Sequence, residues 1–214
     1  ISGNDEKTLQ LASANIKEAV IKLAGRQMNN GGVVLWPQAL QPDNWVTSYA
    51  CHFTVEAERA GYVIPSSFRQ KLINYQKAIS REWRFDPKFK QSAIDQSYRL
   101  FTLALAGQPE RGAMNRLRES QGLPQLSRWL LVAAFAVSGR AEAAGELLDL
   151  RNTETETDMR DYYYGSYARD KSIILYTLTI LKREEEALQV LDDICRSLNS
   201  EEWFSTQSLA WGLF

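Results

Sequence analysis

Apolar residues recur at helical spacing along most of this chain, and short stretches rich in glycine, proline and asparagine separate the periodic segments. No segment alternates apolar and polar residues regularly enough to predict a β-strand. The pattern therefore predicts an all-α protein. The expected helices cover 13–28, 44–60, 66–84, 91–106, 109–121, 125–138, 140–150, 163–182, 184–199 and 204–214, and the longest irregular stretches are 29–43 and 151–161.

The predicted helices are of two kinds that alternate along the chain. Segments 91–106, 129–137 and 172–181 are apolar on nearly every side, as in a helix buried all round, whereas 109–120, 140–150 and 184–199 carry one apolar stripe. Residues 131–148 also align without gaps on 174–191, so the repeating unit is a helical hairpin. Unequal spacing of the hairpin turns argues against a regular helical-repeat adaptor. The alternation favours an α/α toroid of paired helices, a partial barrel with two helical layers.

Length and charge narrow the class of protein. The 214 residues are enough for one core, so we expect a single domain over 1–214. The 25 basic and 26 acidic residues leave no surplus for binding nucleic acid, and no apolar run reaches the ~20 residues of a membrane-spanning helix. The first residue is Ile1, with neither an initiator methionine nor a signal peptide, which we interpret as a piece of a longer protein.

Few residues could support chemistry. His52 is the only histidine, which excludes the histidine-rich zinc motifs, and it shares a helical face with Trp45 and Tyr49. We expect it to be a partly buried, hydrogen-bonded residue, because no nucleophile or second acid accompanies it. Cys51 and Cys195 are expected to be small buried hydrophobes, although the sequence leaves a disulfide between them open. No catalytic residue, metal site or cofactor is predicted.

Carboxylates support an alternative, an α/α-barrel enzyme acting on a glycan or prenyl substrate. The dipeptide Asp192-Asp193 resembles the start of an aspartate-rich magnesium motif, but the third aspartate is missing, because Arg196 occupies its place. Asp95, Asp161 and Asp170 could form a glycosidase-type pair, but nothing fixes their separation, and solvated helix ends or ion pairs are the favoured explanation.

Two further segments stand out. Residues 152–158 form an acidic, threonine-rich stretch without apolar anchors, which we expect to be an exposed loop. Residues 162–164 are three tyrosines before Gly165, and this arrangement suggests close packing within the protein.

An ordered set of motifs runs over nearly the whole chain. The motifs are Gly-Gly-x-x-x-Trp at 31–36, Trp-x-Thr-x-Tyr at 45–49, Gly-Tyr-x-x-Pro at 61–65, Tyr-Gly-Ser-x-x-Arg-Asp at 164–170 and Ser-Thr-Gln at 205–207. In order and spacing this set resembles bacterial alpha-2-macroglobulin-like proteins, in the thioester-domain portion, which is an α/α toroid. The chain departs from the family pattern in two places. Val33 and Val34 stand where the family usually has an aromatic residue, and the acidic stretch at 152–158 is a second departure.

The resemblance implies a protease trap. In that family a Cys-x-Glu-Gln segment forms an internal thioester, bait cleavage exposes the thioester, and a lysine of the attacking protease is acylated. Here Cys51 precedes His52 and Cys195 precedes Arg196, so neither matches that cysteine. Either the thioester segment lies upstream of Ile1, or the parent protein lacks it, and the sequence leaves both open.

The resemblance also implies a structural, non-enzymatic role in an extracytoplasmic parent, periplasmic or on the cell surface. The expected partners are other domains of the same parent chain and, through the parent, target proteases, with no nucleic acid and no membrane insertion. Residues expected to shield the thioester region or to pack between domains are Trp36, Trp45, Tyr49, His52, Tyr164, Arg169, Asp170 and Gln207.

Overall fold

The computed structural model describes residues 6–145, 147, 151–156 and 165–214. In this part of the chain all regular secondary structure is helical, apart from one isolated bridge between Gln27 and Val33. This confirms the predicted all-α class. The helices are α1 (Glu6–Gly25), α2 (Asn44–Arg59), α3 (Ser66–Glu82), α4 (Gln91–Leu105), α5 (Arg111–Arg118), α6 (Gln125–Val137), α7 (Ala141–Gly145), α8 (Tyr167–Ile180), α9 (Glu184–Leu198) and α10 (Thr206–Leu213).

The boundaries differ most from the prediction at the first helix. Helix α1 begins at Glu6 rather than at residue 13, because its first turns contain good helix formers but are exposed and therefore lack an apolar stripe. Helix α8 begins at Tyr167, where the Ser166 hydroxyl accepts a hydrogen bond from the backbone N–H of Arg169 at 3.1 Å. Residues 163–164, where we expected this helix to start, lie outside the described part.

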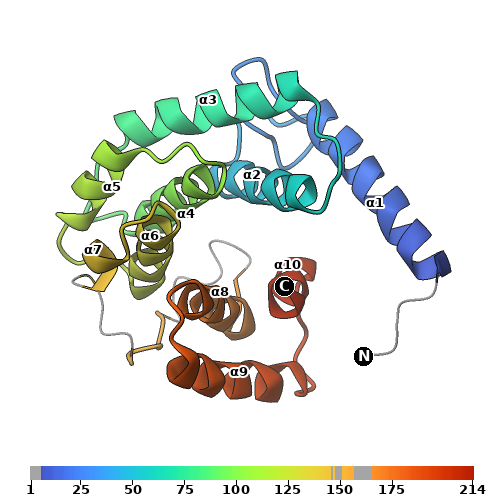
Figure 1. Cartoon of the computed structure of the whole chain (residues 1–214). Helices are drawn as coiled ribbons and strands as arrows, with labels where there is room; N and C mark the ends of the chain where they lie inside the picture. Colours follow the sequence, from blue (N-terminus) through green and yellow to red (C-terminus); the bar gives the residue numbers. More distant parts are fainter. Residues whose placement is uncertain (1–5, 146, 148–150, 157–164) are drawn as a thin grey trace. The chain divides into compact units, whose positions relative to one another are not determined.

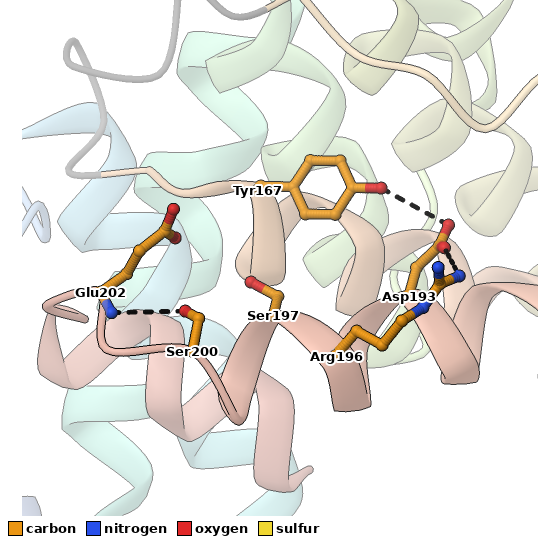
Figure 2. Close-up of a pocket in the computed structure, with 6 residues that line it drawn as sticks. All are labelled: Tyr167, Asp193, Arg196, Ser197, Ser200 and Glu202. Carbon is orange, nitrogen blue, oxygen red and sulfur yellow. Dashed lines mark hydrogen bonds and ion pairs between the residues drawn. The ribbon is translucent and has the colours of Figure 1, made fainter.

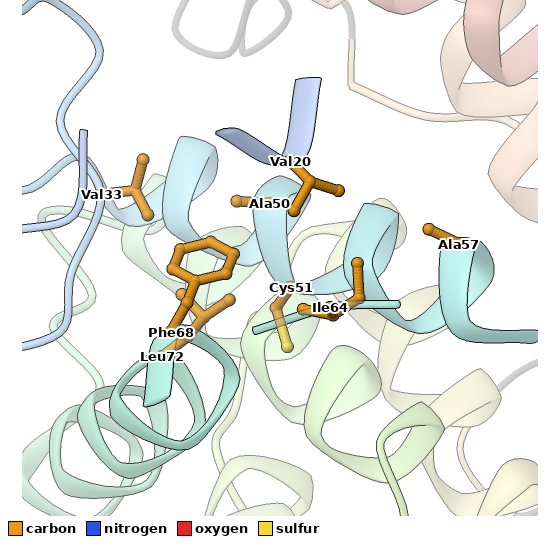
Figure 3. Close-up of a cluster of buried hydrophobic side chains, with 8 residues drawn as sticks. All are labelled: Val20, Val33, Ala50, Cys51, Ala57, Ile64, Phe68 and Leu72. Atoms are coloured by element: carbon orange, nitrogen blue, oxygen red, sulfur yellow. The ribbon is translucent and has the colours of Figure 1, made fainter. Parts of the chain in front are cut away.

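The chain divides into two compact units, 1–79 and 80–214, and each is described here by itself. The single domain expected over 1–214 stays a prediction. In the first unit, the core consists of side chains from α1, α2 and α3 together with Val33 from the loop between α1 and α2 and Ile64 from the segment between α2 and α3. Figure 3 shows the members of this core: Val20, Val33, Ala50, Cys51, Ala57, Ile64, Phe68 and Leu72.

The second unit consists of two layers of helices (Figure 1). Helices α4, α6 and α8 pack side by side and are buried nearly all round, and α10 packs on α8. Helices α5 and α9 pack on α4 and α8 and bury only one stripe, and α7 packs on α6. The alternation read from the sequence is confirmed for these paired helices.

The inner helices of the second unit end in the same way. The residue two positions beyond each helix is left-handed: Gly107, Gly139 and Lys182 have φ angles of 72°, 77° and 57°. In each case the next backbone N–H donates to a carbonyl five residues earlier, at 2.8 to 2.9 Å. This is the Schellman arrangement that glycine favours. Lys182 adopts the same left-handed conformation although it has a side chain, and the contact of its Cβ with the backbone costs free energy.

Replacing Lys182 with glycine should therefore stabilise the chain. We expect the free energy of unfolding to rise by up to about 1 kcal/mol, because relief of the left-handed strain exceeds the entropy gained by the unfolded chain. Gly139→Ala at the equivalent turn is the matched control, and should lower stability by about 1 kcal/mol. Urea denaturation of both variants measures the two changes. A destabilised K182G variant would contradict the inference that Lys182 is strained at a helix end that favours glycine.

Candidate functional site

The Gly-Gly segment forms a tight loop that packs against α3. A Cβ on Gly31, whose φ is 97°, would lie 2.3 Å from the backbone oxygen of Lys71, and a Cβ on Gly32 would lie 2.5 Å from Pro42. Only glycine permits this approach. The Gln27 amide also ties the loop to α3, donating to the carbonyls of Gly31 and Phe68 at 3.0 Å each.

Thr47, in the Trp-x-Thr-x-Tyr motif, holds the other side of this loop. Its buried hydroxyl accepts from the N–H of Val33 at 3.0 Å and lies 2.6 Å from the carbonyl oxygen of Asp43, to which it donates. Asp43 caps α2 by accepting from the N–H of Val46 at 2.8 Å, and its own N–H donates to the Val33 carbonyl at 3.0 Å. The two motifs thus form one hydrogen-bonded unit.

This fixed loop exposes two large apolar side chains. Trp36 is 66% exposed and Leu40 is 89% exposed. The backbone around them is held, because the Arg26 guanidinium donates to the carbonyl of Leu35 at 3.0 Å and the N–H of Ala39 donates to the carbonyl of Trp36 at 3.0 Å. A large aromatic side chain on an ordered loop is typical of a protein–protein contact.

The aromatic residues of α2 behave differently. Trp45 and His52 are buried, and Tyr49 is half-buried, which raises the pKa of its hydroxyl. Burial, together with the charge of Arg59, lowers the pKa of His52 to about 3. His52 lies 3.9 Å from Glu56, but it is neutral at pH 7 and so forms no charged pair there. It is a core residue, as expected, rather than a base open to a substrate.

The pH dependence of stability tests this assignment. His52 takes up a proton near pH 6.5 when unfolded but only near pH 3 when folded, so the unfolded state binds more protons between these values. The stability contribution is complete above pH 6.5 and falls by about 1.4 kcal/mol per pH unit below it. Unfolding measurements at pH 6.5 and 5.5 should differ by about 1 kcal/mol, because the imidazole of the unfolded chain is only half protonated at pH 6.5. His52→Gln should remove this difference, and an unchanged difference in H52Q would refute the assignment.

In the second unit, two motifs that are forty residues apart in sequence meet in a buried polar cluster. The Arg169 guanidinium donates to Asp170 at 2.7 Å and to Gln207 at 3.3 Å, and both Arg169 and Asp170 are about 2% exposed or less. Ser166 donates to Ser208 at 2.8 Å. The cluster joins the start of α8 to the start of α10. Its role is to fix these two helix ends.

The acidic stretch also links helices of this unit, because its side chains form hydrogen bonds with α6 and α8. The expectation of a plain exposed loop was therefore wrong. Both carboxylate oxygens of Glu156 accept from the N–H of Gln125, at 2.8 and 2.9 Å, and so cap α6, where Pro124 provides no side-chain cap. Thr155 donates to Asp170 at 3.2 Å. Residues 157 and 158 lie outside the described part.

Lys171 also holds the acidic stretch, and its position was not expected from the sequence. Its buried ammonium donates to Thr153 and Glu154 at 2.9 and 3.0 Å and pairs with Asp193 at 3.2 Å. Burial disfavours the charged form, but the contacts with Glu154, Tyr167 and Asp193 outweigh burial and raise the pKa of Lys171. A lysine within an apolar helix was the only sequence signal for this network.

The predicted residues thus fall into separate groups. Arg169, Asp170 and Gln207 lie together; Trp45 and His52 are buried in α2, whereas Trp36 is exposed on the loop before it. Tyr164 lies outside the described residues. No finding tests their expected role in shielding, which stays a prediction. Thr47, Ser166 and Ser208 lay in or beside the quoted motifs, but sequence reasoning did not select them.

The two cysteines and the aspartates considered as a catalytic pair occupy different environments in the described part of the chain. Cys51 is buried as expected, but Cys195 is exposed, because it faces away from the stripe that α9 packs on α8; both are thiols, so they form no disulfide. Asp170 is engaged by Arg169, Asp95 is buried, and Asp161 lies outside the described residues.

Two features are absent from the described residues. No group of three or more His, Cys, Asp or Glu side chains there could hold a metal ion. Among the helices described above, none is both long enough and apolar enough to cross a membrane.

Comparison with solved structures relates the whole chain to bacterial alpha-2-macroglobulins. The native conformation of the Escherichia coli protein matches with a TM-score of 0.82 and 25% identity, over 100% of this chain and 14% of that one. A crystal structure of the native E. coli protein from domain MG7 to the C-terminus matches with a TM-score of 0.80 and 25% identity, over 100% and 35%. Salmonella alpha-2-macroglobulin reacted with methylamine matches with a TM-score of 0.82 and 22% identity, over 100% and 14%.

No protein-family model and no curated protein matches the sequence. The structural matches confirm the resemblance that the motifs indicated. The chain spans only about a seventh of the full-length relatives, at 14% to 15% of their length.

Proposed function

We propose that this alpha-2-macroglobulin-like chain is the scaffold part of the thioester domain in a bacterial protease trap, and that it does no catalysis itself. The observation that supports this most strongly is the agreement of two independent signals. The ordered motifs indicated the family, and the fold of the whole chain matches one portion of E. coli alpha-2-macroglobulin at 25% identity. The parent would be extracytoplasmic and would act on proteases by trapping them.

The proposed scaffold role agrees with the positions of the motifs that carry the family resemblance. Arg169 and Asp170 are buried where α8 meets Gln207, and Trp45 and His52 are buried in the packing of α2, so these four side chains offer little surface to a second domain. Trp36, the last residue of the Gly-Gly-x-x-x-Trp motif, is exposed, and so is Leu40 four residues further along the same loop. We therefore assign the contact with another domain of the parent to the loop that carries them.

A pair of substitutions in this loop distinguishes contact from folding. Trp36→Ser with Leu40→Ser should change the stability of the isolated chain by less than about 0.5 kcal/mol, because both side chains are already exposed. In the parent protein the same change should lower the melting temperature or raise protease sensitivity, because an apolar contact is lost. Calorimetry of both proteins measures this. Leu188→Ser with Leu191→Ser, on the exposed face of α9, is the control.

The trapping function itself is tested on the parent protein. Treatment with a protease should cleave a bait region and change the mobility of the parent on a native gel. The E. coli protein was studied in two forms, described as activated by trypsin and by porcine elastase, which motivates this design. A parent whose native mobility is unchanged by proteases would oppose the proposal.

Thioester chemistry is a separate question within the proposal. Neither cysteine of this chain is followed by the x-Glu-Gln of a thioester motif, so any thioester must be formed by other residues of the parent. Methylamine, with which the Salmonella relative was reacted, is the direct probe. Incorporation of methylamine by the parent would identify a thioester, and its absence would place the parent among relatives that trap without one.

A further inference from the structure

The six residues 151–156, here called the strap, are attached to two helices of the second unit. At α6, the Gln125 side chain donates to a strap carbonyl at 3.0 Å, in addition to the contact of its backbone N–H with Glu156. At α8, Lys171 binds two strap side chains and Asp170 binds a third. The strap therefore links the N-terminal turns of α6 and α8.

Polar contacts hold the strap in place. Its sequence is Arg-Asn-Thr-Glu-Thr-Glu, and none of these six residues is buried in the structure that describes them. The side chain of Glu154, which binds Lys171, is 75% exposed. A segment that buries no apolar side chain of its own opens at a lower free-energy cost than the helices around it. We therefore expect the strap to open in the folded chain, with α6 and α8 still formed.

Lys171 provides the contacts that keep the strap on α8. Its buried ammonium donates to two strap side chains, at 2.9 and 3.0 Å. Its third partner is Asp193 of α9, which also accepts from Tyr167 at 3.4 Å and from Arg196 at 2.8 Å (Figure 2). Asp193 therefore keeps partners when Lys171 is replaced, so a change of Lys171 acts mainly on the strap.

A series of contacts leads from the strap to α10. Thr155 donates to one carboxylate oxygen of Asp170 at 3.2 Å, and Arg169 donates to the other at 2.7 Å. Arg169 also donates to Gln207, in the first turn of α10, at 3.3 Å. When the strap opens, Asp170 loses its contact with Thr155 and water reaches the buried pair. Charge interactions weaken in water, so the hold of Arg169 on Gln207 should weaken too.

We propose that the strap is a gate over the buried Arg169–Asp170 pair and that Lys171 keeps it closed. Opening admits water to the pair, and the loss of order passes through Gln207 to the start of α10. The packing of α10 thus depends on whether six polar residues are in place. The inference does not depend on the proposed function, because it concerns contacts within the second unit only.

Hydrogen exchange of the ¹⁵N-labelled chain, followed by NMR, tests the role of Lys171. The reporter is the backbone N–H of Gln125, whose acceptor is the strap carboxylate of Glu156. Lys171→Met keeps a long apolar stem without the ammonium and should raise the exchange rate at least about tenfold. Thr177→Val is the matched control, because it removes a buried hydrogen bond within α8, to Ile173, at 2.9 Å. It should leave the rate within about twofold.

A double-mutant cycle tests the transmission to α10. The reporter is the N–H of Leu209, which donates to the carbonyl at the start of that helix at 3.1 Å. Lys171→Met alone should raise the exchange rate of this amide at least about threefold. In a Gln207→Leu background, which lacks the link to the buried pair, the same change should still raise the rate at Gln125 but should add nothing at Leu209.

Three results would overturn the proposal. They are an unchanged rate at Gln125 in K171M, an equal rise in T177V, and an effect of K171M on Leu209 that is the same with and without Gln207. Glu154→Gln is a second test of the closed strap, because its exposed side chain makes normal folding the expectation. It should raise the rate at Gln125 about threefold, and an unchanged rate would also count against the proposal. Since trapping by the parent is measured separately, failure here would leave the proposed function intact.

Discussion

Replacing Asp170 with asparagine is expected to lower the free energy of unfolding by about 3 to 5 kcal/mol. The change leaves the buried guanidinium of Arg169 without its carboxylate, and an uncompensated buried charge is among the largest single costs in a protein core. Thr155 would also face an amide in place of the carboxylate oxygen 3.2 Å away. Urea denaturation followed by circular dichroism measures the loss.

Two controls separate burial from charge pairing. The double change Arg169→Met with Asp170→Leu removes both charges and should recover part of the lost stability. Arg196→Ala, at the exposed pair with Asp193, should cost less than about 1 kcal/mol. A loss below about 1 kcal/mol in D170N would mean that Arg169 is solvated, contrary to its burial.

Replacing Gly31 with alanine is expected to destabilise the chain by about 3 kcal/mol or more. The new Cβ would lie 2.3 Å from the Lys71 carbonyl oxygen, which is backbone and cannot move aside alone, and the φ of 97° adds strain of its own. The loop should detach from α3 and Trp36 should lose its fixed position. Thermal unfolding measures the loss, and faster hydrogen exchange in residues 26–43 should accompany it.

Gly61→Ala is the control for backbone strain without steric overlap. Gly61 has a similar φ of 88°, but nothing lies within 4 Å of an added Cβ. This variant should lose only about 1 kcal/mol. If the two variants lost equal stability, close packing of the loop on α3 would not be the reason for glycine at position 31.

The helices of the second unit could be predicted from sequence because burial and periodicity agree there. Segment 91–106 is apolar on nearly every side, and α4 is buried nearly all round from Ala93 to Leu105. Helix α1 was placed too late for the opposite reason, since Val20 is its only buried residue and the pattern of apolar positions is weak in its first turns.

The polar contacts were less predictable, because they depend on which helix ends meet. The motif around Arg169 and the motif around Gln207 could be quoted from sequence, but their 3.3 Å contact could not. The acidic stretch lacked apolar anchors and was expected to be exposed, whereas its anchors are the ammonium of Lys171, the carboxylate of Asp170 and the helix end at Gln125. Cys195 was misplaced because Leu191 and Leu198 at helical spacing suggested a buried face, and Leu191 is itself 42% exposed.

The most direct measurement of the central claim is the retention of a protease by the parent protein. The parent is incubated with trypsin and passed over a size-exclusion column, and the eluted fractions are assayed for trypsin and for its activity. If this chain belongs to a protease trap, trypsin should elute with the parent and should be inhibited there. Trypsin that elutes free and fully active, with the parent intact or simply degraded, would contradict the account.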